Sequence, residues 1–158
     1  MSVLLDLSSR YADVVTAVFS EPIAFKAWFA TVAVSLAVVQ VLSAARIYGR
    51  LERIIRIPYP PIGRIHRWSG RLVVLFTLPV AFHCIFILGF QTTDTRVVVH
   101  SLAGSFVYGV FAAKVFIVKD HGYPRWALPV VGGTLFTIMT TLWLTSSLWY
   151  FTEVRFGF

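Results

Sequence analysis

The 158-residue chain is 58% hydrophobic and 16% aromatic, and only 13% of its residues are charged, about half the charged share of a soluble domain. This composition excludes an ordinary soluble domain and favours an integral membrane protein. The net charge is +7, but the basic residues lie between apolar segments and match no nucleic-acid motif, so we expect no nucleic-acid partner. The single cysteine, Cys84, excludes a disulfide framework and a CxxC metal site.

The N-terminal residues, 1 to 22, mix acidic and apolar side chains and lack the basic start of a signal peptide. They predict a short amphipathic helix on the membrane surface, ended by Pro22. Four apolar segments follow, each near the ~20 residues that cross a bilayer as a helix. They cover residues 23–45, 72–90, 97–118 and 127–151. The chain is therefore expected to be all-α, a single integral membrane domain over 1–158 built as a four-helix bundle.

The basic residues predict how the bundle is oriented. Between residues 46 and 71 lie seven arginines and only one acid, Glu52, and the loop between the third and fourth segments carries Lys119 and Arg125. The hairpin between the second and third segments carries only Asp94 and Arg96. Because positive loops stay on the cytoplasmic side, we expect both basic loops inside and both termini outside, in a bacterial cytoplasmic membrane.

Two histidines flank the outer hairpin, His83 in the second segment and His100 in the third. At 1.5 Å per residue they lie ~10 and ~5 Å below the outer edge, so their imidazoles are expected to meet. Ionisable groups inside a membrane indicate function. Two facing imidazoles in an apolar slot suit heme iron, whereas copper or zinc would need further Cys, Asp or Glu ligands. The alternative is that each histidine is hydrogen-bonded to a neighbouring helix.

The neighbours of His100 fit a macrocycle. Gly104, one turn further along, has no side chain, so a flat ring has room beside the helix. Arg96, at the outer mouth, is expected to pair with a heme propionate.

The other two histidines, His66 and His121, lie near the cytoplasmic face. If they approach each other they would hold a second heme. The alternative is that they are interfacial residues in wet, basic segments, in contact with lipid phosphates or loop carbonyls. Lys114, on nearly the same helix face as His100, either pairs with an inner anionic group or extends to the headgroups.

The last segment carries small residues at roughly four-residue steps, which predict a face for close helix packing. They are Gly132, Gly133, Thr137, Thr141 and Thr145.

The stretch GRIHRWSGRLVVLFTLPVAFHCIF, residues 63–86, resembles the start of the heme-bearing region in ferric-reductase-like and cytochrome b561-like transmembrane b-type cytochromes. The similar features are the entry from His66 to Leu72 and the later histidine, His83. The resemblance implies that His83 ligates heme. The family usually has two ligating histidines on a heme helix, whereas the third segment here has Lys114 at that spacing. No flavin or nicotinamide domain accompanies the motif, so the resemblance implies a small cytochrome or subunit rather than a complete reductase.

We therefore expect a membrane b-type cytochrome that holds one heme b between His83 and His100 and transfers single electrons. A second heme at His66 and His121 stays open. The expected partners are membrane lipid and a redox partner protein or a quinone. The alternative is a non-redox anchor or assembly subunit of a multi-subunit membrane complex, favoured by the small size of the chain and by its packing stripe.

Overall fold

The computed structural model describes residues 9, 10, 13, 15, 17, 21–120 and 122–155. These residues form helices, turns and loops, with no strand among them. Four helices are long and apolar enough to cross a membrane, which confirms the predicted class of an all-α membrane bundle. Most of the amphipathic helix expected over residues 1 to 22 lies outside the described residues.

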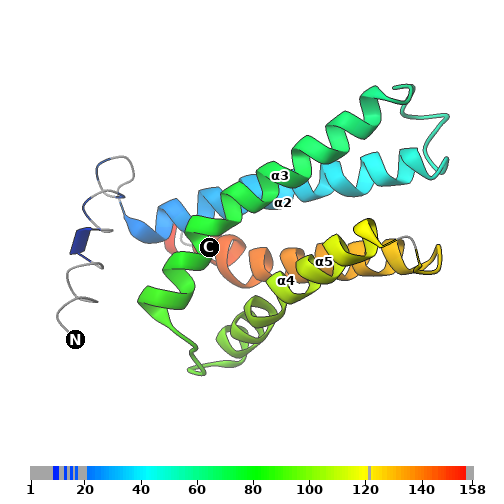
Figure 1. The fold of residues 1–158 in the computed structure, drawn as a ribbon. Coiled ribbons are helices and arrows are strands. Elements are labelled where there is room, and N and C mark those ends of the chain that lie inside the picture. Colours follow the sequence, from blue (N-terminus) through cyan, green and yellow to red (C-terminus); the bar gives the residue numbers. More distant parts are fainter. Residues whose placement is uncertain are drawn as a thin grey trace.

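The helices are joined in chain order by short turns and loops (Figure 1). The first is α2 (Pro22–Ile47). The second is α3 (Pro61–Phe82), continued by a π-helical segment, η1 (His83–Leu88). After the hairpin come α4 (Thr95–Lys119) and α5 (Ala127–Trp143), and α5 continues through two further π-helical segments, η2 (Leu144–Leu148) and η3 (Tyr150–Arg155).

Local chemistry explains where these helices start. Proline occupies the first position of α2 and of α3, where its missing N–H costs nothing and its fixed φ suits the helix. Asp94 caps α4 by accepting a hydrogen bond from the Val97 N–H at 3.0 Å. Helix α3 begins at Pro61, eleven residues before the apolar segment that was predicted from residue 72, and its first turns carry Arg64, Arg67 and Arg71. His66 therefore lies inside a helix and not in a loop before it.

The packing leaves one side of the bundle open. Helix α2 packs along α3 and also against α5, and α4 packs along α5. The second and third spans were expected to be packed neighbours, but α3 and α4 make almost no close contact, and α4 has no buried residue. The helices are therefore ordered α3, α2, α5, α4, with a gap in the packing between the first and the last. Figure 1 shows both basic loops at one end of the molecule and the α3–α4 hairpin at the other.

The core lies between α2, α3 and α5. Ala33 and Ala37 of α2 meet Val73 of α3 and Met139 of α5, with Phe76 and Phe136 packed around them. A second cluster joins Ala24 and Ala27 to Tyr150. The alanines allow close approach of the backbones, which is the usual basis of helix association in lipid.

The predicted packing stripe on the last span was wrong over its first turns. Gly133 and Thr137 are exposed, and a Cβ at Gly132 or Gly133 would meet no described atom within 4 Å. The buried positions of this span are Ala127, Met139, Ser147 and Tyr150. Gly132, Gly133 and Thr137 therefore do not mark a contact face, whereas Thr145, further along the predicted stripe, contacts α4.

The C-terminal end of the second span departs from α-helical geometry. Pro79 lies inside the helix and has no N–H to donate to the carbonyl one turn earlier. The wider π pattern follows from His83 to Leu88 and ends at Gly89, whose φ of 68° suits glycine. This segment determines which side chains of the second span face α4.

Candidate ligand-binding site

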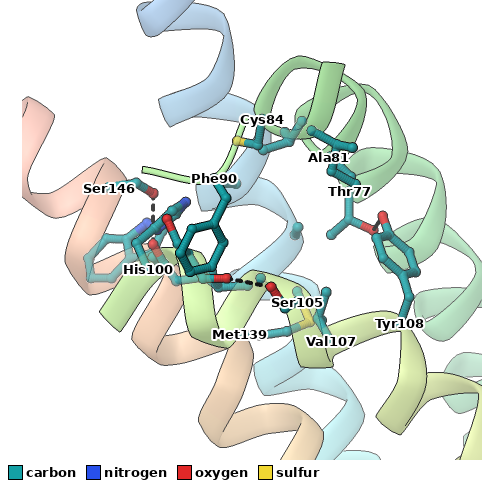
Figure 2. Close-up of a pocket in the computed structure, with 18 of the residues that line it drawn as sticks. Thr77, Ala81, Cys84, Phe90, His100, Ser105, Val107, Tyr108, Met139 and Ser146 are labelled. Carbon is teal, nitrogen blue, oxygen red and sulfur yellow. Dashed lines mark hydrogen bonds between the residues drawn. The ribbon is translucent and has the colours of Figure 1, made fainter. Parts of the chain in front are cut away.

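A cavity of about 500 Å³ lies between α3 and α4, where the two helices fail to pack (Figure 2). Its volume is within the range of small-molecule and cofactor sites. The lining is mainly apolar, with a few polar groups. These polar side chains are Thr77, Cys84, His100, Ser101, Ser105, Tyr108, Trp143 and Ser146. A hydrogen bond from the Tyr108 hydroxyl to Thr77 Oγ1, 3.3 Å long, joins the two helices across it.

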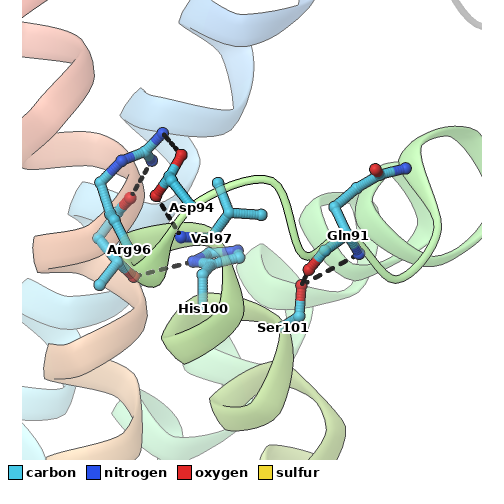
Figure 3. A network of polar contacts seen from close by, with 7 residues as sticks. Gln91, Asp94, Arg96, Val97, His100 and Ser101 are labelled. Carbon is cyan, nitrogen blue, oxygen red and sulfur yellow. Dashed lines mark hydrogen bonds and ion pairs between the residues drawn. The ribbon is translucent and has the colours of Figure 1, made fainter.

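His100 lines this cavity with one ring nitrogen already engaged. Its Nδ1 lies 3.0 Å from Thr145 Oγ1 (Figure 3). The Thr145 hydroxyl donates its own proton to the carbonyl of Thr141, at 2.7 Å. The threonine oxygen therefore accepts from Nδ1–H, and the proton on Nδ1 leaves Nε2 with its lone pair. A second group that fixes the tautomer in this way is typical of imidazoles that bind metals.

Gly104 also lines the cavity. A Cβ at this position would meet only Leu142 Cδ2, at 3.8 Å, among the described atoms. The surface beside the helix is therefore open, as the sequence predicted. Ser105 donates to the Ser101 carbonyl at 2.8 Å, so its hydroxyl is satisfied within α4.

His83 occupies a different place. It is buried, with 7% of its surface exposed, and it lines neither this cavity nor the smaller one beside it. Its neighbour Cys84 lines both. The structure therefore brings His100 and Gly104 together and places His83 outside the lining, so the predicted ligation by His83 and His100 stays a prediction.

A smaller cavity of about 260 Å³ adjoins the first on the side of the α3–α4 hairpin and shares His100 and Cys84 with it. Arg96 also lines this cavity, and its guanidinium already has partners within the protein. Nη1 donates to the Thr145 carbonyl at 2.7 Å, and Nη2 lies 3.8 Å from Asp94 Oδ2 (Figure 3). The guanidinium carbon also lies 4.2 Å from the Trp149 ring centre.

Lys26 of α2 lines the smaller cavity too. This lysine is not among the site residues that were predicted from the sequence. Its position a few residues into an apolar span was the signal that would have identified it, because a cation inside a membrane helix indicates function.

Of the two remaining histidines, the structure describes His66 and not His121. His66 turns toward α2, where its Nδ1 lies 2.9 Å from Ser43 Oγ. The Gln40 amide donates to the His66 carbonyl, and also to Ser69 Oγ at 2.7 Å. His121 lies outside the described residues. The predicted second heme site, His66 with His121, therefore stays a prediction.

Fold and site together define a class of protein: a four-helix membrane protein with a mainly apolar cavity between two spans and an imidazole on its wall. The chain belongs to DUF6529, a family of unknown function whose model matches residues 7–158. No curated protein and no solved structure matches it.

Proposed function

We propose that this protein is a membrane b-type cytochrome that binds one heme b between α3 and α4. The observation that carries the proposal is His100, which lies on the wall of a cavity of about 500 Å³ with its Nδ1 held by Thr145. An imidazole oriented in this way presents Nε2 as a ligand.

The chain offers further features that suit a flat, apolar cofactor. Gly104 leaves the wall of α4 open, and Leu142 and Met139 supply apolar contact from α5.

The resemblance of residues 63–86 to transmembrane b-type cytochromes supports His83 as the second axial ligand. This assignment requires the His83 ring to enter the cavity that Cys84 now lines. The π-helical turn that starts at His83 is where such a change of register is easiest, since π turns are local irregularities, often at functional sites.

With two imidazoles on the iron, the bound heme supplies a one-electron couple suited to electron transfer rather than oxygen activation. Thr145 keeps the His100 ring in the ligating tautomer, and the apolar lining keeps water away from the site. The natural partners are a membrane quinol as electron donor and a redox protein outside the membrane as acceptor. In this proposal the membrane is the bacterial cytoplasmic membrane, and the basic loops face the cytoplasm.

Titration of the purified protein with hemin tests the proposal. Wild-type protein is expected to bind one equivalent with a sharp Soret band. His100→Ala is expected to lose this binding, and His83→Ala to lose it or to convert the iron to a five-coordinate form. The matched control is His66→Ala, which removes an imidazole outside the cavity and is expected to bind as wild type does. Equal binding by wild type and His100→Ala would contradict the proposal.

One observation favours a second candidate, a structural subunit of a larger membrane complex. Helix α4 buries none of its residues within the chain, and a partner helix would cover it. Cysteine crosslinking from Phe116→Cys, on the exposed surface of α4, to other proteins in native membranes tests this. A single crosslinked partner together with a heme-free protein would favour the structural role.

A further inference from the structure

We propose that Lys26 of α2 binds the anionic end of the ligand whose apolar body occupies the larger cavity. The inference rests on the proposed function, in which this anionic end is a propionate carboxylate of heme b. It assigns a binding role to a residue outside the predicted set.

The two cavities adjoin each other. Val80, Cys84 and Gly89 of the second span and His100 and Ser101 of α4 line both of them. A ligand beside His100 is therefore next to the smaller cavity. An acidic group at the edge of such a ligand would enter the space lined by Lys26. Because the smaller cavity lies at the hairpin end of the bundle, the acidic group would be directed away from the middle of the membrane.

The charges in the smaller cavity are unbalanced. Lys26 and Arg96 both line it, and no Asp or Glu among the described residues does so. Asp94 Oδ2 lies 3.8 Å from Arg96 Nη2, and Asp94 also caps α4. Arg96 has further partners in the Thr145 carbonyl and the Trp149 ring. The Arg96 guanidinium is therefore largely occupied by partners within the protein.

Lys26 differs from Arg96 in this respect. Its side chain is half-buried within a membrane span, and among the described residues no hydrogen bond or ion pair engages its ammonium. A cation in such a place is costly unless an opposite charge accompanies it. An anionic oxygen supplied by the ligand satisfies this requirement. A phospholipid phosphate would supply the same chemistry, so the test must separate the two sources.

The first experiment compares two porphyrins, iron protoporphyrin IX and its dimethyl ester, which lacks the two negative charges. Wild type is expected to bind the diacid about tenfold or more tightly than the diester, as for a hydrogen bond to a charged group. Lys26→Met is expected to lose most of this preference. The matched control, Lys119→Met at the exposed end of α4, is expected to keep it. An unchanged preference in Lys26→Met would overturn the inference.

A lipid source gives a different result. If anionic phospholipid copurifies with wild type and with Lys119→Met but not with Lys26→Met, the anion belongs to a headgroup. That result would overturn the assignment to a ligand carboxylate.

The second experiment needs no heme. Cys84 is the single cysteine of the chain and lines both cavities, so its reaction rate reports on the charge nearby. Each reagent's rate at Cys84 is divided by its rate with a small free thiol in solution. The normalised rate is expected to be higher for a methanethiosulfonate that carries a sulfonate than for one that carries a trimethylammonium group, and Lys26→Met is expected to reduce this ratio severalfold. If the sulfonate preference depends on Lys26 while neither porphyrin binds, the proposed cytochrome function fails and the anion site stands. If heme binds but neither assay responds to Lys26→Met, the inference fails and the cytochrome function stands.

Discussion

Thr145 and His100 are joined by a hydrogen bond of 3.0 Å between the threonine hydroxyl oxygen and ring Nδ1. The bond links η2 to α4 and fixes the tautomer of the histidine, because the hydroxyl proton is already donated to the Thr141 carbonyl. The same threonine supplies its carbonyl to Arg96. One residue of the last span therefore positions two residues of α4 at the site.

Substitution of Thr145 by valine tests this positioning role. Thr145→Val keeps the shape and removes the acceptor for Nδ1, so heme affinity is expected to fall by about tenfold or more. The low-spin optical spectrum of the residual complex is expected to broaden as the ring becomes free to rotate. Thr145→Ser is expected to restore affinity, and Thr137→Val, at an exposed position of the same span, to have no effect. Loss of affinity in all three variants would indicate a structural defect instead.

Gly104 tests whether the cavity itself is the binding site. Gly104→Leu places a side chain in the cavity beside His100, so heme binding is expected to be abolished while the helices stay folded. Gly109→Leu introduces the same side chain on the same helix, at an exposed glycine whose added Cβ would meet no described atom within 4 Å. It is expected to bind heme normally. Hemin titration, with circular dichroism as the control for folding, measures both, and normal binding by Gly104→Leu would place the ligand elsewhere.

Two other glycines distinguish a packed contact from an open one. A Cβ on Gly70 would lie 3.2 Å from Gln40 Oε1 and 3.3 Å from Gln40 Cδ, and the amide of Gln40 is held by Ser69 and the His66 carbonyl. Gly70→Ala is therefore expected to lower the melting temperature in detergent, with a loss of about 1 kcal/mol from the weakened interhelical hydrogen bonds. Gly133→Ala, on the open surface of α5, is expected to be neutral or slightly stabilising, since alanine is the better helix former. Equal melting temperatures for the two variants would contradict this account of the α2–α3 contact.

Arg96 provides a stability test at the hairpin end of the bundle. Its guanidinium joins the start of α4 to the last span through the Thr145 carbonyl and the Trp149 ring. Arg96→Met is expected to destabilise the protein by about 1 to 2 kcal/mol, the scale of a hydrogen bond to a charged group. Arg125→Met, in the exposed loop at the other end, is the matched control. Thermal unfolding in detergent compares them, and equal stability of the two variants would show that Arg96 does not join the two segments.

The sequence predicted the helices better than their arrangement. Apolar segments of membrane-spanning length predicted all four spans, because lipid leaves the backbone no alternative to the helix. The open side between α3 and α4 was not predictable in this way, because a short hairpin between two spans suggests direct packing. The actual neighbours are determined by alanines of α2, such as Ala33 and Ala37, which allow α3 and α5 to approach.

The sequence also predicted the positions of site residues along each helix better than the directions of their side chains. His100, Gly104 and Arg96 lie toward the α3–α4 hairpin, because a rise of 1.5 Å per residue places them near the start of α4. The direction of His83 was not predictable from an ideal helix, since Pro79 and the π turn alter the register at that point. Lys26 was missed because a residue near the start of a span looks like a flanking charge until the neighbouring helices are known.

The most direct test of the central claim is the reduced-minus-oxidised spectrum of the protein purified from membranes, with a pyridine hemochrome count. The account predicts a b-type spectrum with one heme per chain, lost in His100→Ala and retained in His66→Ala. A colourless, folded wild-type protein that also fails to bind added hemin would contradict it.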